Sequence, residues 1–286
     1  MIKTRFYVGG CSGSSSPIPA RREFGNLTTA LGISCGNQAL FVDNGSGIPK
    51  VSKFLLDNGA ESVCGLQTHY HQDHKLGIQN NSLLFRKNLV HEIFAPKLCK
   101  KSFQQIMLDD FGTETWPVSP EMFGCIADVR EFYPGQALGT VWNIRTLLLD
   151  HPGGSVMYRI ATPDGDVVVA TDNEPKEEHM GLMAEFISGC QLLYFDLQYR
   201  KSEYEGETGI CGTPAMSRKN WGHGTPEMLG GLLSRCQILP SLIMVGHHDP
   251  SRTDGDLFVF EHEVIKPLSN YPSKISFARE GEAVEL

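Results

Sequence analysis

The 286-residue sequence lacks the features of a membrane or secreted protein. No apolar run approaches the roughly 20 residues that a membrane-spanning helix needs. The first residues, MIKTRFYVGGCSGSSS, contain no apolar signal-peptide core. We therefore expect a cytosolic protein that does not bind a membrane.

Positive charge is also scarce. The 25 lysines and arginines stand against 33 aspartates and glutamates, which gives a formal net charge of −8. A protein that binds long nucleic acids relies on attraction to phosphates, and this balance does not supply it. The 41% of hydrophobic and 20% of charged residues are typical of a globular protein rather than a disordered one.

Paired cysteines are missing as well. The eight cysteines are scattered singly, with no CxxC pair. In a chain of this length they indicate buried, reduced thiols rather than a disulfide framework or a zinc ribbon.

Internal repeats, low-complexity tracts and long linkers are absent too, so we expect a single domain over residues 1–286. Three nearly all-apolar runs, Val167–Ala170, Leu192–Phe195 and Leu242–Val245, indicate strands that are buried on both faces. Helices are expected at residues 51–58, at residues 98–109, after Thr225 and from Asp254. This alternation predicts an α/β protein with two sheets covered by helices.

The residues that carry chemistry begin with a histidine cluster, Thr68-His69-Tyr70-His71-Gln72-Asp73-His74. His69 and His71 are two residues apart, so on an extended segment they point to the same side and can hold one ion. Asp73 and His74 would turn toward a second ion about 3.5–4 Å away. The alternative is a solvated polar loop, which three imidazoles and a carboxylate directly after a buried strand disfavour.

Further candidate ligands stand at the ends of other apolar runs. His151 follows Leu147–Leu149, Asp172 follows Val168–Ala170, and the pair His247-His248 follows Leu242–Val245. A single such residue is more often a cap, but three strand ends beside a histidine cluster favour metal ligation. Three histidines lie neither in these stretches nor in the one that contains His223. We interpret them as structural: His91, His179 and His262.

The order of these motifs resembles that of the metallo-β-lactamase superfamily of two-metal hydrolases: HxHxDH, one His, one Asp, and a last strand that ends in His. The resemblance runs from the strand that ends in Asp43 to the segment around Asp249. It implies an αββα sandwich of two mixed β-sheets flanked by helices. It also implies two divalent metal ions, with Zn²⁺ favoured over Mn²⁺ or iron. The resemblance is compatible with a homodimer.

Carried over by position, the resemblance implies that His69, His71 and His151 hold one metal. Asp73, His74 and His247 would hold the other, and Asp172 would bridge both. His247 is favoured over His248 because it aligns with the first residue after the final strand. Asp43 either supports the metal loops by hydrogen bonding or initiates the turn at Asn44-Gly45.

Two stretches resemble the tRNase Z and related phosphodiesterase branch of this superfamily. Gly222-His223-Gly224-Thr225 resembles its His-x-Thr motif, in which the histidine contacts the scissile phosphate. The free N–H groups of the helix that follows would favour an anion there. The alternative is that His223 lies in a turn and Thr225 only caps the helix. The segment from Gly10 to Thr28 resembles the glycine- and serine-rich opening of the same branch.

The resemblance implies a phosphodiesterase for a small phosphate-bearing substrate such as a cyclic nucleotide, because the long glycine-rich arm with which tRNase Z holds its tRNA is missing. In that reaction a metal-bridging hydroxide attacks phosphorus. Asp73 takes or orients the proton of the attacking water, and His223 protonates the leaving group or only clamps the phosphate.

Other functions fit the same motifs. Lactonases and glyoxalase II share the HxHxDH cluster and the bridging Asp, so hydrolysis of a lactone, thioester or other carboxylic ester is an alternative. A di-iron redox or oxygen-binding sensor is a second alternative. A structural homologue without activity is disfavoured, because every expected ligand position is filled.

Overall fold

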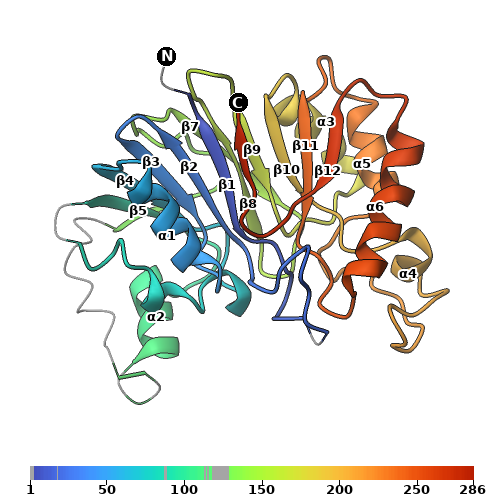
Figure 1. The fold of residues 1–286 in the computed structure, drawn as a ribbon, viewed down its shortest axis with the longest axis horizontal. Coiled ribbons are helices and arrows are strands. Elements are labelled where there is room, and N and C mark those ends of the chain that lie inside the picture. Colours follow the sequence, from blue (N-terminus) through green and yellow to red (C-terminus); the bar gives the residue numbers. More distant parts are fainter. Residues whose placement is uncertain (1–2, 18, 87–88, 113, 115, 118–128) are drawn as a thin grey trace.

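Two β-sheets pack face to face in the computed structural model, which describes residues 3–286 except 18, 87–88, 113, 115 and 118–128 (Figure 1). Both sheets mix parallel and antiparallel pairs. Within the described residues, the first sheet has seven strands. In sheet order they are β13 (Ala283–Glu285), β1 (Arg5–Gly10), β2 (Ala30–Cys35), β3 (Gln38–Val42), β4 (Ser62–Leu66), β5 (Val90–Pro96) and β6 (Val129–Phe132).

The second sheet has six strands in the same described part of the chain. In sheet order they are β12 (Lys274–Phe277), β11 (Leu242–Gly246), β10 (Leu192–Asp196), β9 (Val167–Ala170), β8 (Ser155–Ile160) and β7 (Ile144–Leu149).

Helices cover the outer faces of both sheets. Two lie against the first sheet, α1 (Ile48–Asp57) and α2 (Phe103–Phe111), and three lie against the second, α3 (Glu177–Ile187), α5 (Pro226–Leu233) and α6 (Asp254–Leu268) (Figure 1). Shorter elements are α4 (Lys201–Glu205) and the 3₁₀ turns η1 (Gln72–His74) and η2 (Ile78–Asn80). The two mixed sheets flanked by helices confirm the predicted α/β sandwich.

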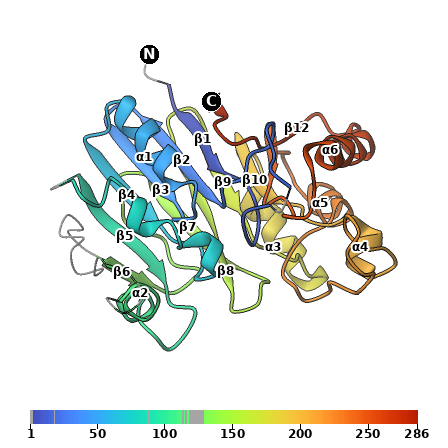
Figure 2. The ribbon, with the colours of Figure 1, turned by 60° about the horizontal axis from the view of Figure 1, so that its bottom comes forward.

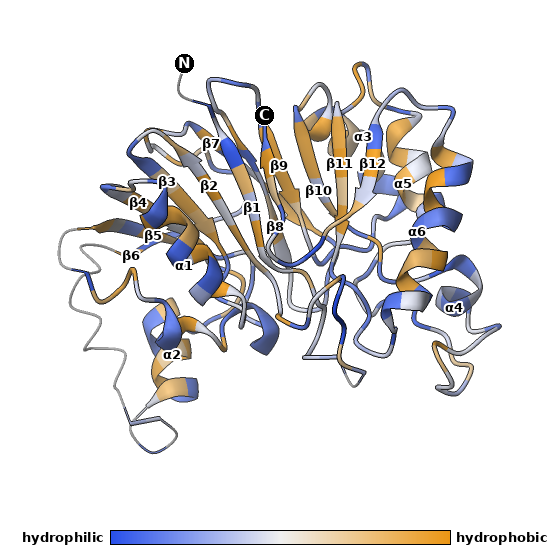
Figure 3. Cartoon of the chain, in the orientation of Figure 1, coloured by the Kyte–Doolittle hydropathy of each residue, from blue (hydrophilic) through white to orange (hydrophobic). Residues whose placement is uncertain are grey.

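Hydrophobic side chains fill three layers: between the sheets, and between each sheet and its helices. The short strand β9 contributes side chains to two of these layers. Val167 and Val169 face the other sheet, whereas Val168 and Ala170 face the helices. The prediction that this strand is buried on both faces is confirmed, and Figure 3 shows the hydrophobic strands inside the more polar helices.

The helix boundaries follow from their caps. Thr225 is the N-cap of α5 and accepts a hydrogen bond from the Met228 N–H, as predicted. The expected helix at residues 98–109 begins later, at Phe103, because Ser102 is its N-cap and accepts from the Gln105 N–H. None of the described helices is long and apolar enough to cross a membrane.

The prediction of buried thiols is only partly right. All seven described cysteines are free, and Cys11, Cys64 and Cys190 are buried. Cys99 and Cys211 are exposed, because they lie in bends and turns outside the sheets. The eighth, Cys125, lies outside the described residues.

Candidate metal centre

The predicted ligands follow the carboxyl ends of strands that run in the same direction. His69 and His71 follow β4, His151 follows β7, Asp172 follows β9 and His247 follows β11. Figure 2 turns this end of both sheets toward the viewer. Because these strand ends converge, side chains that are up to 178 residues apart in sequence meet at one place.

Two groups of ligand atoms meet here. Within each group, one ligand atom from every residue lies within 4.8 Å of the others. The first group is His69, His71 and His151, and the second is Asp73, His74, Asp172 and His247. The structure therefore brings together all seven residues that the sequence selected as ligands, in the predicted grouping.

Asp172 lies between the two groups. Its Oδ1 is 3.7 Å from Nε2 of His69 and 3.8 Å from Nε2 of His151. The same oxygen is 3.1 Å from Nε2 of His247, and Oδ2 is 2.9 Å from Nε2 of His74. One carboxylate thus contacts histidines of both groups, which is the position of a bridging ligand.

The outer nitrogens of four histidines are engaged away from the centre, so their hydrogen-bond partners assign the tautomer. Nδ1 of His74 donates to Asp43 Oδ2 (2.7 Å), and Nδ1 of His151 donates to the Gly222 carbonyl (2.9 Å). Nδ1 of His247 donates to Gln198 Oε1 (3.1 Å). His69 Nδ1 donates to the Thr68 hydroxyl. Each Nε2 is left with its lone pair toward the centre, as in metal sites.

Asp43 organises the histidine loop. Besides His74, its carboxylate accepts from the Thr68 N–H (2.7 Å), the Thr68 hydroxyl (2.7 Å) and the Gln67 side-chain amide (3.0 Å). The Thr68 hydroxyl in turn accepts from His69, so Asp43 orients ligands of both groups. Of the two roles considered for Asp43, these contacts favour support of the loop.

A divalent cation fits this donor set. Nε2 of His69 is buried and has no hydrogen-bond partner, although buried polar atoms are nearly always paired. Nε2 of His74 faces carboxylate oxygens of Asp172 (2.9 Å) and Asp73 (3.3 Å). Burial lowers the pKa of His69 well below its usual value and that of His151 to about 4, which keeps both in the neutral form that binds metals. Burial also lowers the pKa of His74, but Asp172 and Asp73 raise it more, so a buried excess of negative charge surrounds that ring.

His223 lies beside the two groups. One of its ring nitrogens is within 4.8 Å of ligand atoms of His151 and Asp172. Its Nδ1 donates to Asp196 Oδ2 (2.7 Å), and its ring stacks on that of His247 with 4.7 Å between centroids. A buried carboxylate thus fixes the ring at the edge of the centre.

The loop after β1 closes the centre from another side. The Ser14 N–H donates to Asp73 Oδ2 (2.8 Å). A Cβ built on Gly13 would lie 2.5 Å from Nδ1 of His247, so only glycine lets the backbone pass this close to the ring. The glycine- and serine-rich opening noted in the sequence therefore packs directly on two candidate ligands.

The neighbouring His248 points elsewhere. Its Nε2 donates to the Ala278 carbonyl (2.9 Å), and its ring stacks on Phe277. The turn after β11 separates the pair, because His247 has a left-handed backbone (φ 58°). Asp43 (φ 63°) and Asp172 (φ 55°) share this conformation, which is uncommon for non-glycine residues and clusters at functional sites.

Sequence reasoning missed three residues of this region. Asp196 is the last residue of β10, so the signal that selected Asp172, a carboxylate at the end of an apolar run, was present there too. Gln198 holds His247. Glu174 accepts from the N–H groups of Asn220 and Gly222, both at 2.8 Å. No sequence motif marks these last two, because their partners come from distant segments.

No protein-family model and no curated protein sequence matches this chain. Solved structures do match. The metallo-β-lactamase fold protein YhfI from Bacillus subtilis has a TM-score of 0.67 at 16% identity, with 100% of both chains covered. The chain therefore has the metallo-β-lactamase fold, as the resemblance implied.

Two further matches extend the comparison. Unliganded yeast PDE1 has a TM-score of 0.69 at 15% identity, with 100% of both chains covered. The short form of human tRNase Z has a TM-score of 0.64 at 14% identity, with 98% of both chains covered. At these identities the matches show the shared fold, and the chemistry must be argued from the site.

Proposed function

We propose that the protein is a binuclear-metal-dependent hydrolase that cleaves a small phosphodiester, such as a cyclic nucleotide. The observation that carries this proposal is the position of His223. It is held by Asp196 and faces the ligand groups without belonging to the two sets described above. A fixed imidazole beside a cation site suits an anionic substrate, and the similar structures include a tRNase.

The residues of the centre have different roles in this reaction. One cation would be held by His69, His71 and His151, the other by Asp73, His74 and His247, with Asp172 shared. When bound, two divalent ions supply a water of lowered pKa and neutralise charge on phosphoryl oxygens. The Asp73 carboxylate, fixed by the Ser14 N–H, orients the attacking water or accepts its proton.

Whereas Asp73 acts on the attacking water, His223 acts on the phosphate or the leaving group. Because Asp196 accepts from Nδ1, the other ring nitrogen is free to contact a phosphoryl oxygen or the departing alcohol oxygen. Asp196 also stabilises the ring when it carries a positive charge while negative charge develops on the phosphate. The net charge of −8 and the absence of an inserted arm favour a small substrate over a long nucleic acid.

Substrate selectivity tests this proposal. Purified protein reconstituted with Zn²⁺ or Mn²⁺ is assayed on bis(p-nitrophenyl) phosphate, p-nitrophenyl acetate and a lactone, together with Asp196→Asn. We expect metal-dependent cleavage of the phosphodiester, reduced about 10²-fold or more in the variant, the scale of losing a transition-state donor. The matched control is Asp57→Asn, an exposed aspartate on α1.

Two outcomes would contradict the proposal. Cleavage of the acetate or the lactone that dominates and is indifferent to Asp196 would assign the centre to carboxylic esters. Visible iron absorption bands, with no hydrolysis after reconstitution with Zn²⁺ or Mn²⁺, would instead favour the redox or oxygen-binding alternative.

A further inference from the structure

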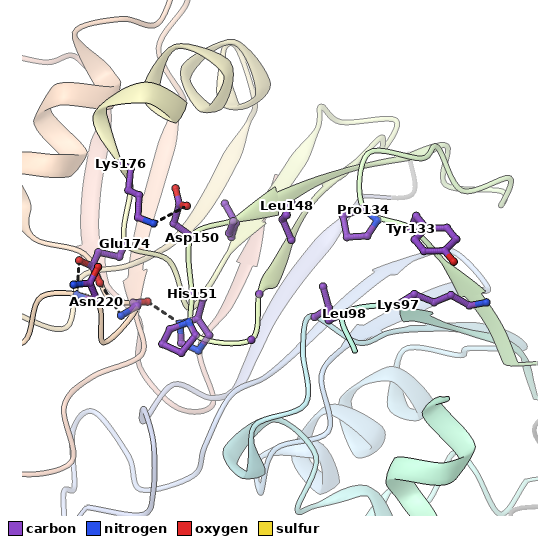
Figure 4. Close-up of a pocket in the computed structure, with 15 residues that line it drawn as sticks. Lys97, Leu98, Tyr133, Pro134, Leu148, Asp150, His151, Glu174, Lys176 and Asn220 are labelled. Atoms are coloured by element: carbon purple, nitrogen blue, oxygen red, sulfur yellow. Dashed lines mark hydrogen bonds and ion pairs between the residues drawn. The ribbon is translucent and has the colours of Figure 1, made fainter. Parts of the chain in front are cut away.

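A depression beside His151 is lined in part by apolar side chains that have no role in the proposed chemistry (Figure 4). We propose that it binds an uncharged planar ring of the substrate, such as a nucleobase, with Tyr133 as the stacking platform. This inference rests on the proposed phosphodiesterase function and specifies the substrate on one side of the phosphate.

The depression has the size and position for such a group. Its volume is about 700 Å³, within the roughly 300–1,000 Å³ of ligand pockets. One end is formed by His151 and Gly222, and the other by Lys97 and Tyr133, as Figure 4 shows for the labelled residues. A ligand that touches the metal centre can therefore extend into it.

Exposed apolar side chains form the surface between these ends. Tyr133 is 61% exposed and Leu148 is 55% exposed, although both are large and hydrophobic. A Cβ built on Gly154 would lie 3.2 Å from Leu98 and 3.4 Å from Leu148, so the two leucines converge there. Gly154 belongs to the same turn as His151, which joins the apolar surface to the metal centre.

Hydrogen bonds hold the turn that carries Tyr133. The Tyr133 N–H donates to Gln136 Oε1 (3.0 Å), and the Gln136 N–H donates back to the Tyr133 carbonyl (3.2 Å). Thr146 of β7 fastens this turn, because its hydroxyl donates to the Gln136 carbonyl (2.6 Å) and accepts from the Gly135 N–H. The Lys97 ammonium lies 5.5 Å from the ring centroid. Because the backbone of this turn is already ordered, less conformational entropy is lost when a ligand stacks on the Tyr133 ring.

The charged groups around the depression are already paired. Lys97 lies 3.5 Å from Glu131, and Lys176 lies 3.5 Å from Asp150. Both oxygens of Glu174 accept backbone N–H groups. No described residue of this lining thus offers an unpaired charge to a second phosphate or a carboxylate, which favours a neutral ring.

The apolar surface is next to a candidate ligand in the chain. Leu148 lies near the end of β7, and His151 follows three residues later in the turn, where both line the depression. A second depression, on the His223 side, is lined by Gln198, Asn220 and Asp249 beside Trp221. We assign the ring to the depression beside His151, and the sugar to the second one, where amide and carboxylate side chains can bind its hydroxyls.

Paired substrates test the assignment. Adenosine 3′,5′-cyclic phosphate is compared with the 3′,5′-cyclic phosphate of methyl riboside, which has no base. In the wild type we expect kcat/KM to be about 10- to 100-fold higher for the nucleotide, the range that corresponds to one aromatic stack. Tyr133→Ala and Leu148→Ala should reduce this ratio about 10-fold through KM, and Tyr133→Phe should retain it.

Leu182→Ala is the matched control, because Leu182 on α3 is 54% exposed and is not one of the residues that line the depression. An unchanged ratio in Tyr133→Ala, or a ratio lost in Trp221→Ala instead, would overturn the assignment. Calorimetric titration with adenosine 5′-monophosphate separates the two proposals. If no phosphodiester is cleaved, the proposed function fails, whereas binding weakened by Tyr133→Ala and not by Leu182→Ala still supports the ring site.

Discussion

The Nε2 atoms of the histidines point to the centre because single residues hold the other ring nitrogen. Asp43 orients two of these rings. It is fully buried and fixes His74 directly and His69 through Thr68. A metal site that lacks such a partner keeps its ligands but loses their orientation. Asp43 therefore belongs to the function of the centre although it lies outside both groups.

Asp43→Asn should weaken metal binding about 10- to 100-fold. The amide presents an N–H₂ group to donors that now meet a carboxylate, which should also lower the free energy of unfolding by about 1–3 kcal/mol. Metal titration and urea denaturation measure the two effects. Unchanged metal affinity would contradict the orienting role, and a loss of stability alone would make Asp43 purely structural.

Most ligands could be predicted from the sequence because their signal is local. His69, His71 and His74 share one short window, and His151, Asp172 and His247 each follow an apolar strand. Asp196 could have been found by the same rule. Gln198 and Glu174 could not, because their roles depend on contacts that only the folded chain creates.

At the scale of elements, the segment between α4 and α5 carries His223 and is fastened by Glu174. Glu174 is buried, and its carboxylate accepts from Asn220, Gly222 and the Tyr204 hydroxyl (2.6 Å). The Gly222 carbonyl accepts from His151. One carboxylate therefore ties the loop to a candidate ligand and to the residue before His223.

Glu174→Gln should lower kcat about 10-fold while metal content stays near the wild-type value, because an amide cannot accept all three hydrogen bonds. Limited proteolysis of the segment 206–225 should become faster. Glu178→Gln, an exposed glutamate on α3, is the control. Equal proteolysis and equal kcat in the two variants would show that Glu174 does not position the loop.

Elements buried on both faces were the easiest to predict. β9 has the expected bounds, and β10 and β11 each extend one residue beyond theirs, since continuous apolar runs leave few alternatives. Short edge elements such as β13, with three residues of which two are exposed, carry no such signal. Their pairing is decided by the neighbouring strand rather than by their own sequence.

At the scale of the whole molecule, the centre joins segments from residue 14 to residue 247, so metal binding should stabilise the entire fold. Removing metal with a chelator should lower Tm by about 5–10 °C, the shift expected for roughly 4 kcal/mol of lost binding free energy. Calorimetry before chelation, after it and after Zn²⁺ is restored measures this. An unaltered Tm would mean that no ion is held at the centre.

The central claim is that His223 serves the reaction while Asp172 holds the metals. Metal content and kcat on bis(p-nitrophenyl) phosphate, measured together for His223→Ala and Asp172→Ala, test it most directly. The account predicts that His223→Ala keeps its metals and loses about 10²- to 10³-fold in kcat, whereas Asp172→Ala loses metal and activity together. Loss of metal from His223→Ala, or full metal content in Asp172→Ala, would contradict it.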